Sequence, residues 1–140
     1  MRYWDASALL PLVYPESASG VLLELVRNDP MITTWALSRV ELASALQRRQ
    51  RDGVLRQTLQ RARTRLTLLA PTWAEVGDLP SVRERALELL ETHPLTARDA
   101  LQLASALLAA EDRPKELPFV TLNADLAQAA RVEGFPVLGS

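Results

Sequence analysis

Short apolar runs alternate with amphipathic stretches along the chain, and this alternation predicts an α/β fold with a largely parallel sheet. The expected strands are the apolar runs at residues 2–4, 31–34, 66–69, 119–122 and 135–138. Helices are expected from about residue 6 and over residues 21–27, 35–49, 54–64, 81–91, 96–108 and 123–131. Residues 73–76 remain unassigned, and residues 111–118 read as a charged loop.

The most regular helical pattern follows Thr96. Five apolar residues fall at the spacing i, i+3, i+4, i+7 and i+8, namely Ala100, Leu103, Ala104, Leu107 and Leu108. This spacing places them on one face of a helix, so the helix is expected to pack deep in the core. His93 and Pro94 interrupt the chain just before it, and His93 reads as a turn residue rather than a general base.

Length and composition are those of an ordinary globular protein. The 140 residues fit a single domain, residues 1–140, with 48% hydrophobic and 24% charged residues. No apolar run approaches the roughly 18 residues that indicate a membrane span, and no basic leader precedes a cleavage site. We therefore expect a cytoplasmic protein. The absence of cysteine excludes disulfides, thiol nucleophiles and thiolate metal sites.

The net charge of −1 conceals an uneven distribution of basic residues. Between residues 48 and 65 lie seven arginines against a single acid, Asp52. Such a stretch suits a phosphate backbone or an acidic partner, although a solvated helix face has the same composition. The candidate contacts for RNA or a protein partner are Arg48, Arg49, Arg56, Arg61 and Arg63.

Four places carry acidic or amide side chains that solvation alone explains poorly. Asp5 ends the first strand, where it serves either as the cap of the next helix or as a site residue, with Ser7 as another candidate cap. Glu41 shares a helix face with small and apolar residues, and Asp99 lies in the first turn of the most apolar helix. Asn123 and Asp125 follow the strand at 119–122.

Each of these residues also has a purely structural interpretation. Thr96 and Asp99 fit a capping box, Asn123 is a favourable helix cap, and Asp125 complements a helix dipole. Glu41 has arginines within reach for an ion pair. Taken singly, the structural interpretation is favoured for all of them except Asp5.

Taken together, these residues indicate a metal site. Carboxyl ends of parallel strands meet at one edge of a sheet, and gathered carboxylates repel one another unless a cation neutralises them. Mg²⁺ or Mn²⁺ prefers oxygen ligands and retains waters that act as nucleophiles. Beside an arginine-rich surface, such a site suggests hydrolysis of a phosphodiester bond.

Other phosphate chemistries fit less well. A haloacid-dehalogenase-type phosphatase needs a second aspartate two residues after Asp5, where this chain has Ser7. The sequence contains no phosphate-binding loop of the Gly-x-x-x-x-Gly-Lys type and no glycine-rich dinucleotide motif after the first strand. A receiver-type signalling domain would need paired acidic residues after the first strand, and this chain lacks them.

Four segments together resemble the PIN domain, and more narrowly the VapC-type toxins of bacterial type II toxin–antitoxin modules. They are Tyr-Trp-Asp-Ala-Ser-Ala-Leu (3–9), Ser-Arg-Val-Glu-Leu-Ala-Ser-Ala-Leu (38–46), Leu-Thr-Ala-Arg-Asp-Ala-Leu-Gln-Leu-Ala-Ser-Ala-Leu (95–107) and Phe-Val-Thr-Leu-Asn (119–123). The resemblance covers essentially the whole chain. It implies a three-layer α/β/α fold around a largely parallel sheet of about five strands, with strand one in the centre.

The resemblance also implies a set of site residues. Asp5, Glu41 and Asp99 match the acidic residues that hold the metal, while Ser7 and Thr121 match hydroxyl positions that support them. The fourth position departs from the family, which usually has aspartate where this chain has Asn123. An uncharged amide there implies weaker binding of a second metal. Asp125 is a less favoured substitute, because it points about 200° away around the helix.

The function implied by the resemblance is that of an Mg²⁺-dependent or Mn²⁺-dependent endoribonuclease, a toxin inhibited by a VapB-like antitoxin and usually a homodimer. In this hypothesis Asp5, Glu41 and Asp99 bind metal, and Asn123 orients a water or a second ion. Two alternatives remain open. One is a catalytically weak PIN-like module that binds RNA or protein, which Asn123 favours, and the other is a DNA-directed nuclease.

Overall fold

A five-stranded, entirely parallel sheet forms the centre of the protein, whose computed structural model describes residues 1–140. The order of the strands across the sheet is β3-β2-β1-β4-β5, so the first strand is central. Their bounds are β1 Arg2–Trp4, β2 Ile32–Trp35, β3 Ala74–Val76, β4 Phe119–Val120 and β5 Val137–Leu138. The expected α/β/α architecture with a central first strand is confirmed.

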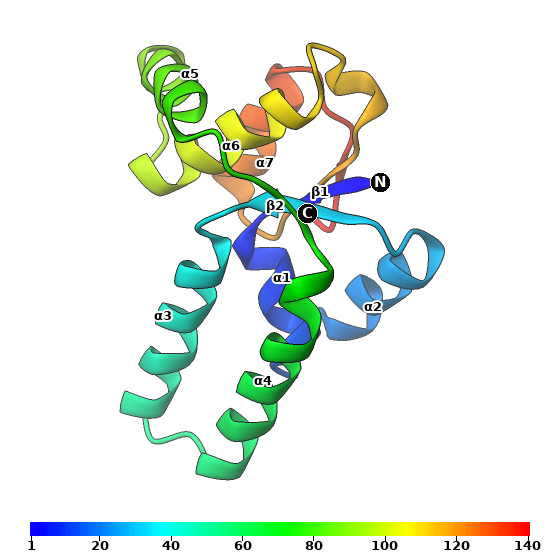
Figure 1. The fold of residues 1–140 in the computed structure, drawn as a ribbon, viewed down its shortest axis with the longest axis vertical. Helices are drawn as coiled ribbons and strands as arrows, with labels where there is room; N and C mark the ends of the chain where they lie inside the picture. Colours follow the sequence, from blue (N-terminus) through cyan, green and yellow to red (C-terminus); the bar gives the residue numbers. More distant parts are fainter.

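Two layers of helices cover the two faces of the sheet (Figure 1). One layer contains α1 (Ala6–Val13), α2 (Ser19–Asn28), α3 (Ser38–Arg51) and α4 (Arg56–Leu69), and the other contains α5 (Leu79–Thr92), α6 (Ala97–Ala109) and α7 (Ala124–Val132). Short 3-10 helices lie at Ala70–Thr72 and Pro114–Glu116. The protein has no helix with the length and apolar character that a membrane crossing requires.

Alternation of side chains along the strands divides the core in two. Tyr3 and Phe119 face the layer of α5, α6 and α7, whereas Trp4 and Val120 face the layer of α1 to α4. These pairs are in register between β1 and β4, and the rings of Tyr3 and Phe119 have centroids 5.1 Å apart. Side chains on both faces of β1 are therefore packed in the core, and this packing holds the end of the strand in place.

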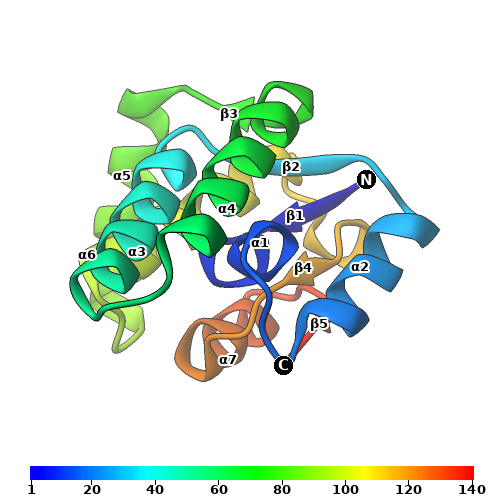
Figure 2. The same ribbon diagram turned by 90° about the horizontal axis from the view of Figure 1, so that it is seen from below.

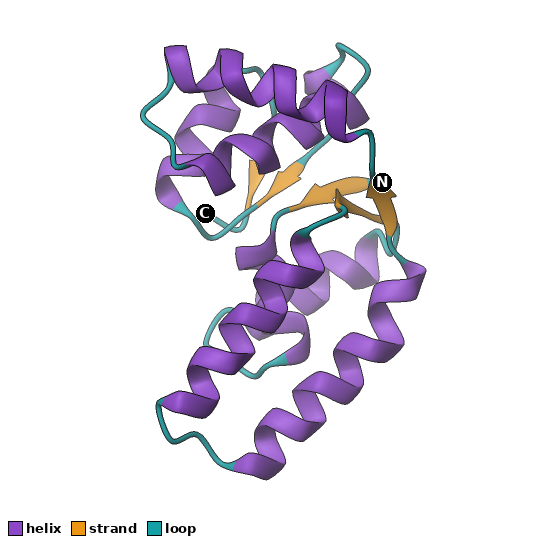
Figure 3. Cartoon of the chain, turned by 60° about the vertical axis from the view of Figure 1, so that its left-hand side comes forward, coloured by secondary structure: helices purple, strands orange, loops and turns teal.

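The hairpin of α3 and α4 extends well beyond the sheet (Figure 3). Seen from below, α1 lies against the middle of the sheet, with α3 and α4 on one side and α2 on the other (Figure 2). The turn between α3 and α4 contains Gly53, whose φ of 83° lies in the left-handed region that glycine adopts without strain. Asp52 and Gly53 together form this turn.

The expected third strand at residues 66–69 is wrong. These residues form the last turn of α4, which runs to Leu69, and the actual third strand is Ala74–Val76 within the segment left unassigned. A four-residue apolar run does not distinguish a strand from the end of a helix. The helix wins here because Leu59 and Ala62 bury one face of it, while Leu68 stays exposed.

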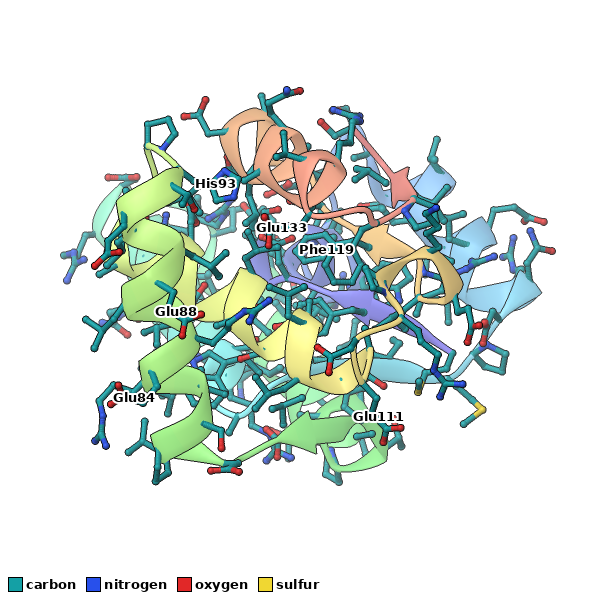
Figure 4. All side chains as sticks on the ribbon, turned by 90° about the horizontal axis from the view of Figure 1, so that it is seen from above. Glu84, Glu88, His93, Glu111, Phe119 and Glu133 are labelled. Carbon is teal, nitrogen blue, oxygen red and sulfur yellow. The ribbon has the colours of Figure 1, made fainter.

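The remaining boundaries differ from expectation by a few residues. The second strand extends through Trp35, so the helix expected at 35–49 begins at Ser38. The helix expected at 54–64 spans Arg56–Leu69. His93 ends α5 as a turn residue, and its Nε2 atom lies 3.1 Å from Glu133 Oε2 beyond α7 (Figure 4).

Candidate active site

The carboxyl ends of β1, β2 and β4 meet at one edge of the sheet, and a pocket of about 340 Å³ opens there. Residues of α1, α3 and α6, the residues just before α7 and the loop residue Glu16 line it. The polar ones are Asp5, Ser7, Glu16, Glu41, Arg48, Arg49, Arg98, Asp99 and Asn123. All four principal site residues expected from the sequence, Asp5, Glu41, Asp99 and Asn123, thus line a single pocket.

Asp5 both caps a helix and faces the pocket. Its Oδ1 atom accepts hydrogen bonds from the Ala8 backbone N–H (3.3 Å) and from the Ser7 hydroxyl (2.8 Å). The side chain is the N-cap of α1, so the alternative assignment of the cap to Ser7 is wrong. Burial raises the pKa of Asp5 to about 6, although the hydrogen bond from Ser7 acts in the opposite direction.

Ser7 and Thr121 connect the start of α1 to the end of β4. The Ser7 hydroxyl donates its proton to Asp5 and accepts the backbone N–H of Leu122 at 2.9 Å. It also lies 3.3 Å from the Thr121 hydroxyl, which itself accepts the Asn123 backbone N–H at 3.0 Å. These bonds hold Asp5 in place relative to the neighbouring strand.

Glu41 projects from the first turn of α3 and is half-buried. Its Oε1 atom accepts a hydrogen bond of 3.2 Å from Gln102 Nε2 on α6. Burial raises the pKa of Glu41 to about 7, and the negative charges of Asp5 and Asp99 add to this shift. The Gln102 hydrogen bond and the charge of Arg98 oppose it.

Asp99 lies in the first turn of α6 with only 7% of its surface exposed. Its backbone N–H donates to the Thr96 hydroxyl at 3.2 Å, which is one half of the expected capping box. The carboxylate does not complete the box; its Oδ2 atom accepts from Asn123 Nδ2 at 3.0 Å. Its other oxygen, Oδ1, lies 4.0 Å from Arg98 Nε. The side chain is therefore turned toward the pocket.

Asn123 presents its amide nitrogen, not its oxygen, to the other site residues. Its Oδ1 atom caps α7 by accepting the backbone N–H groups of Asp125 (3.0 Å) and Leu126 (3.2 Å). Because only an oxygen accepts these two bonds, the NH₂ group must face Asp99. Asp125 is exposed and lies outside the pocket.

The carboxylates of Asp5, Glu41 and Asp99 line the same pocket, but as they stand the three are not close enough together to hold one ion. Each is instead paired with a separate neutral donor: Ser7 for Asp5, Gln102 for Glu41 and Asn123 for Asp99. Burial is the main cause of the raised pKa values of Asp5 and Glu41, and the charges of Asp5 and Asp99 add to the shift only at Glu41, where the charge of Arg98 opposes them. An oxygen-lined, negatively charged pocket of this kind fits a hard divalent cation.

The arginine-rich stretch divides between two surfaces. Arg48 and Arg49 line the carboxylate pocket, where Arg49 bonds to Glu16 at 2.5 Å. Arg56 and Arg63 line a larger pocket of about 680 Å³ between α3 and α4. Arg61 is exposed and lines neither pocket.

Four polar residues of the site were missed from the sequence, and one of them is Glu16, which lines the pocket and pairs with Arg49. Arg98 lines the pocket, and Gln102 and Ser38 lie behind Glu41. Gln102 had a detectable signal, because it is a polar residue among the apolar positions of a helix with a long apolar face. The position of Arg98 next to Asp99 in sequence gave no comparable indication.

The chain is similar to known proteins in sequence and in fold. The PIN domain family matches residues 2–132. A toxin–antitoxin complex from Klebsiella pneumoniae has a chain with a TM-score of 0.63 and 21% identity, covering 99% of this chain and 96% of its own. PAE2754 from Pyrobaculum aerophilum has a TM-score of 0.62 and 23% identity, covering 92% and 79%. No curated protein matches significantly in sequence.

The buried charge of Asp5 predicts a pH-dependent stability in EDTA. A carboxyl whose pKa rises from 3.8 to about 6 on folding stabilises the protein below pH 4, and this contribution is lost as the pH rises through 6. Asp5→Asn removes the charge and keeps a good N-cap. We expect it to raise the Tm by about 5 °C at pH 8 and to change it little at pH 4. Thermal unfolding at both pH values tests this; an equal effect at both would contradict it.

Proposed function

Since the chain belongs to the PIN domain family, we propose that it is a metal-dependent endoribonuclease and the VapC-type toxin of a toxin–antitoxin pair, acting in the cytoplasm. PIN domains are generally nucleases. The observation that carries the proposal is the convergence of Asp5, Glu41 and Asp99 on one pocket that arginines also line. Carboxylates suit a cation, and guanidinium groups suit the phosphates of a nucleic acid.

The proposed roles follow from the contacts of each residue. Asp5, Glu41 and Asp99 hold Mg²⁺ or Mn²⁺, which when bound supplies positive charge to the phosphodiester and activates an attacking water. Ser7 and Thr121 keep Asp5 oriented through their hydrogen bonds. Asn123 has its oxygen committed to the cap of α7, so its NH₂ group is the part available to orient Asp99 or a water.

In this proposal two groups of arginines bind two different partners. Arg48 and Arg49 border the carboxylates and contact the RNA, whereas Arg56, Arg61 and Arg63 lie on the α3–α4 hairpin and contact a VapB-like antitoxin. The similarity to a chain from a toxin–antitoxin complex supports an antitoxin partner. We further propose that the protein acts as a homodimer.

One observation favours a second candidate function. Asn123 faces Asp99 with an uncharged amide group, so this position adds no negative charge for binding a metal. Weaker metal binding would suit a module that binds RNA or protein and cleaves poorly. A DNA-directed nuclease is the remaining alternative, because carboxylates that suit a cation and arginines that suit phosphates serve either nucleic acid. The following experiments separate these functions.

Metal dependence is the first prediction. Purified protein freed of antitoxin should cleave single-stranded RNA with Mg²⁺ or Mn²⁺ and lose this activity in EDTA. Asp5→Asn should reduce cleavage about 100-fold or more, since it removes a charged metal ligand. Asp125→Asn is the matched control, because Asp125 is exposed outside the pocket. Cleavage that withstands EDTA would refute the mechanism, and preferential cleavage of single-stranded DNA would favour the DNA-directed alternative.

Restoring a carboxylate at position 123 is the second prediction. Asn123→Asp keeps the cap of α7 and adds an anionic oxygen facing the pocket, so Mn²⁺ should bind roughly tenfold more tightly and cleavage should increase. RNA binding in EDTA should stay unchanged. Asn28→Asp, on the exposed end of α2, is the control. A very large rise in cleavage would identify the natural protein as a weak nuclease, and unaltered Mn²⁺ affinity would refute the assignment of this position.

The position of Arg48 gives the third prediction. Arg48→Glu should weaken RNA binding and lower the slope of log K against log salt by about one, because one phosphate contact is lost. Arg61→Glu makes the same change of charge away from the pocket and should alter the slope less. Filter-binding or anisotropy titrations in 50 to 200 mM salt measure both slopes. Equal slopes for the two variants would contradict the placement of RNA beside Arg48.

A further inference from the structure

A buried amide lies directly behind the carboxylate pocket. Gln102 of α6 is 1% exposed, one helical turn after Asp99, and it is surrounded by core residues. Burial of an amide is costly unless its polar atoms all find partners. Gln102 satisfies this condition with bonds to Tyr3, Ser38 and Glu41, which belong to β1 and α3.

The proton positions in this network are fixed by an acceptor at its far end. Thr34 Oγ1 donates its single proton to the carbonyl oxygen of Trp4 at 2.7 Å, and a carbonyl only accepts. Ser38 Oγ must then donate to Thr34 across their 2.7 Å contact. Ser38 therefore accepts its other hydrogen bond, the 3.0 Å bond from Gln102 Nε2.

The same logic fixes the amide of Gln102. Its Oε1 atom accepts the Tyr3 hydroxyl at 2.6 Å, and the two protons of Nε2 go to Ser38 and to Glu41 Oε1. A flipped amide would place its oxygen against the Ser38 oxygen, whose proton is already used, and against the carboxylate. The network thus holds an N–H group aimed at Glu41 from the core.

We propose that Gln102, oriented by Tyr3, is a positioning residue that fixes the Glu41 carboxylate for cation binding. Of the three neutral donors in the site, Gln102 alone is anchored in the interior, because Ser7 and Asn123 lie at helix starts on the sheet edge. The Tyr3 hydroxyl satisfies the amide oxygen of Gln102, and Ser38 accepts one of the two N–H groups on Nε2. The second N–H group points out of the core and donates to Glu41, which lines the pocket. This inference rests on the proposed function, in which Glu41 is a metal ligand.

The test compares Mn²⁺ binding in three proteins by calorimetry, with thermal unfolding measured in parallel. Gln102→Leu should raise the Kd for Mn²⁺ by about tenfold or more, the effect typical of losing a group that orients a metal ligand. Leu103→Ala is the control, because it removes buried volume from the same helix without touching the network. It should lower the Tm and leave the Kd within about twofold.

Tyr3→Phe decides the matter if Gln102→Leu fails to fold. It deletes only a buried hydroxyl that does not line the pocket, so the amide loses one of the two core partners that orient it and Mn²⁺ should bind several-fold more weakly. Unchanged Mn²⁺ affinity in Gln102→Leu or Tyr3→Phe, with normal binding by the natural protein, overturns the positioning role alone. Failure of the natural protein to bind Mn²⁺ overturns the proposed function and this inference with it.

Discussion

Negative charge held at the carboxyl edge of the sheet is the constraint on which the rest of the site depends. Asp5 is 3% exposed because β1 is the central strand and both of its faces are packed, so the residue that follows it lies deep in the molecule. Glu41 and Asp99 reach the same pocket from α3 and α6. Their mutual repulsion raises the pKa of Glu41 further and is relieved only by a positive charge.

Structural and chemical roles coincide in these residues. Asp5 and Asn123 each cap a helix that begins where a strand ends, and the same side chains face the pocket. In a parallel sheet such helix starts gather at one edge. The difference between the two is chemical: Asp5 has an anionic oxygen available beyond its capping bond, whereas Asn123 uses its only oxygen as the cap and offers a donor. This single substitution shapes one corner of the site.

Much of this arrangement is predictable from the sequence, since it follows from local patterns. The order of apolar runs predicts a parallel sheet, and the placement of Asp5 and Asn123 after strands predicts their common edge. The strand predicted at residues 66–69 is wrong, because a four-residue apolar run fits a strand and a helix end equally well. Only the packing of the folded chain distinguishes the two. Gln102 and Arg98 act through residues distant in sequence, so their contacts emerge only in three dimensions.

The central claim is that a divalent cation binds in this pocket by drawing Asp5, Glu41 and Asp99 closer together than the three carboxylates lie in the structure. Crystals of the protein grown with Mn²⁺ test it most directly, because the anomalous signal of manganese locates the ion independently of any activity. The account predicts an anomalous peak in the pocket with oxygen atoms of all three carboxylates as its nearest protein ligands. A fully occupied Mn²⁺ elsewhere, with none between these three side chains, would contradict it.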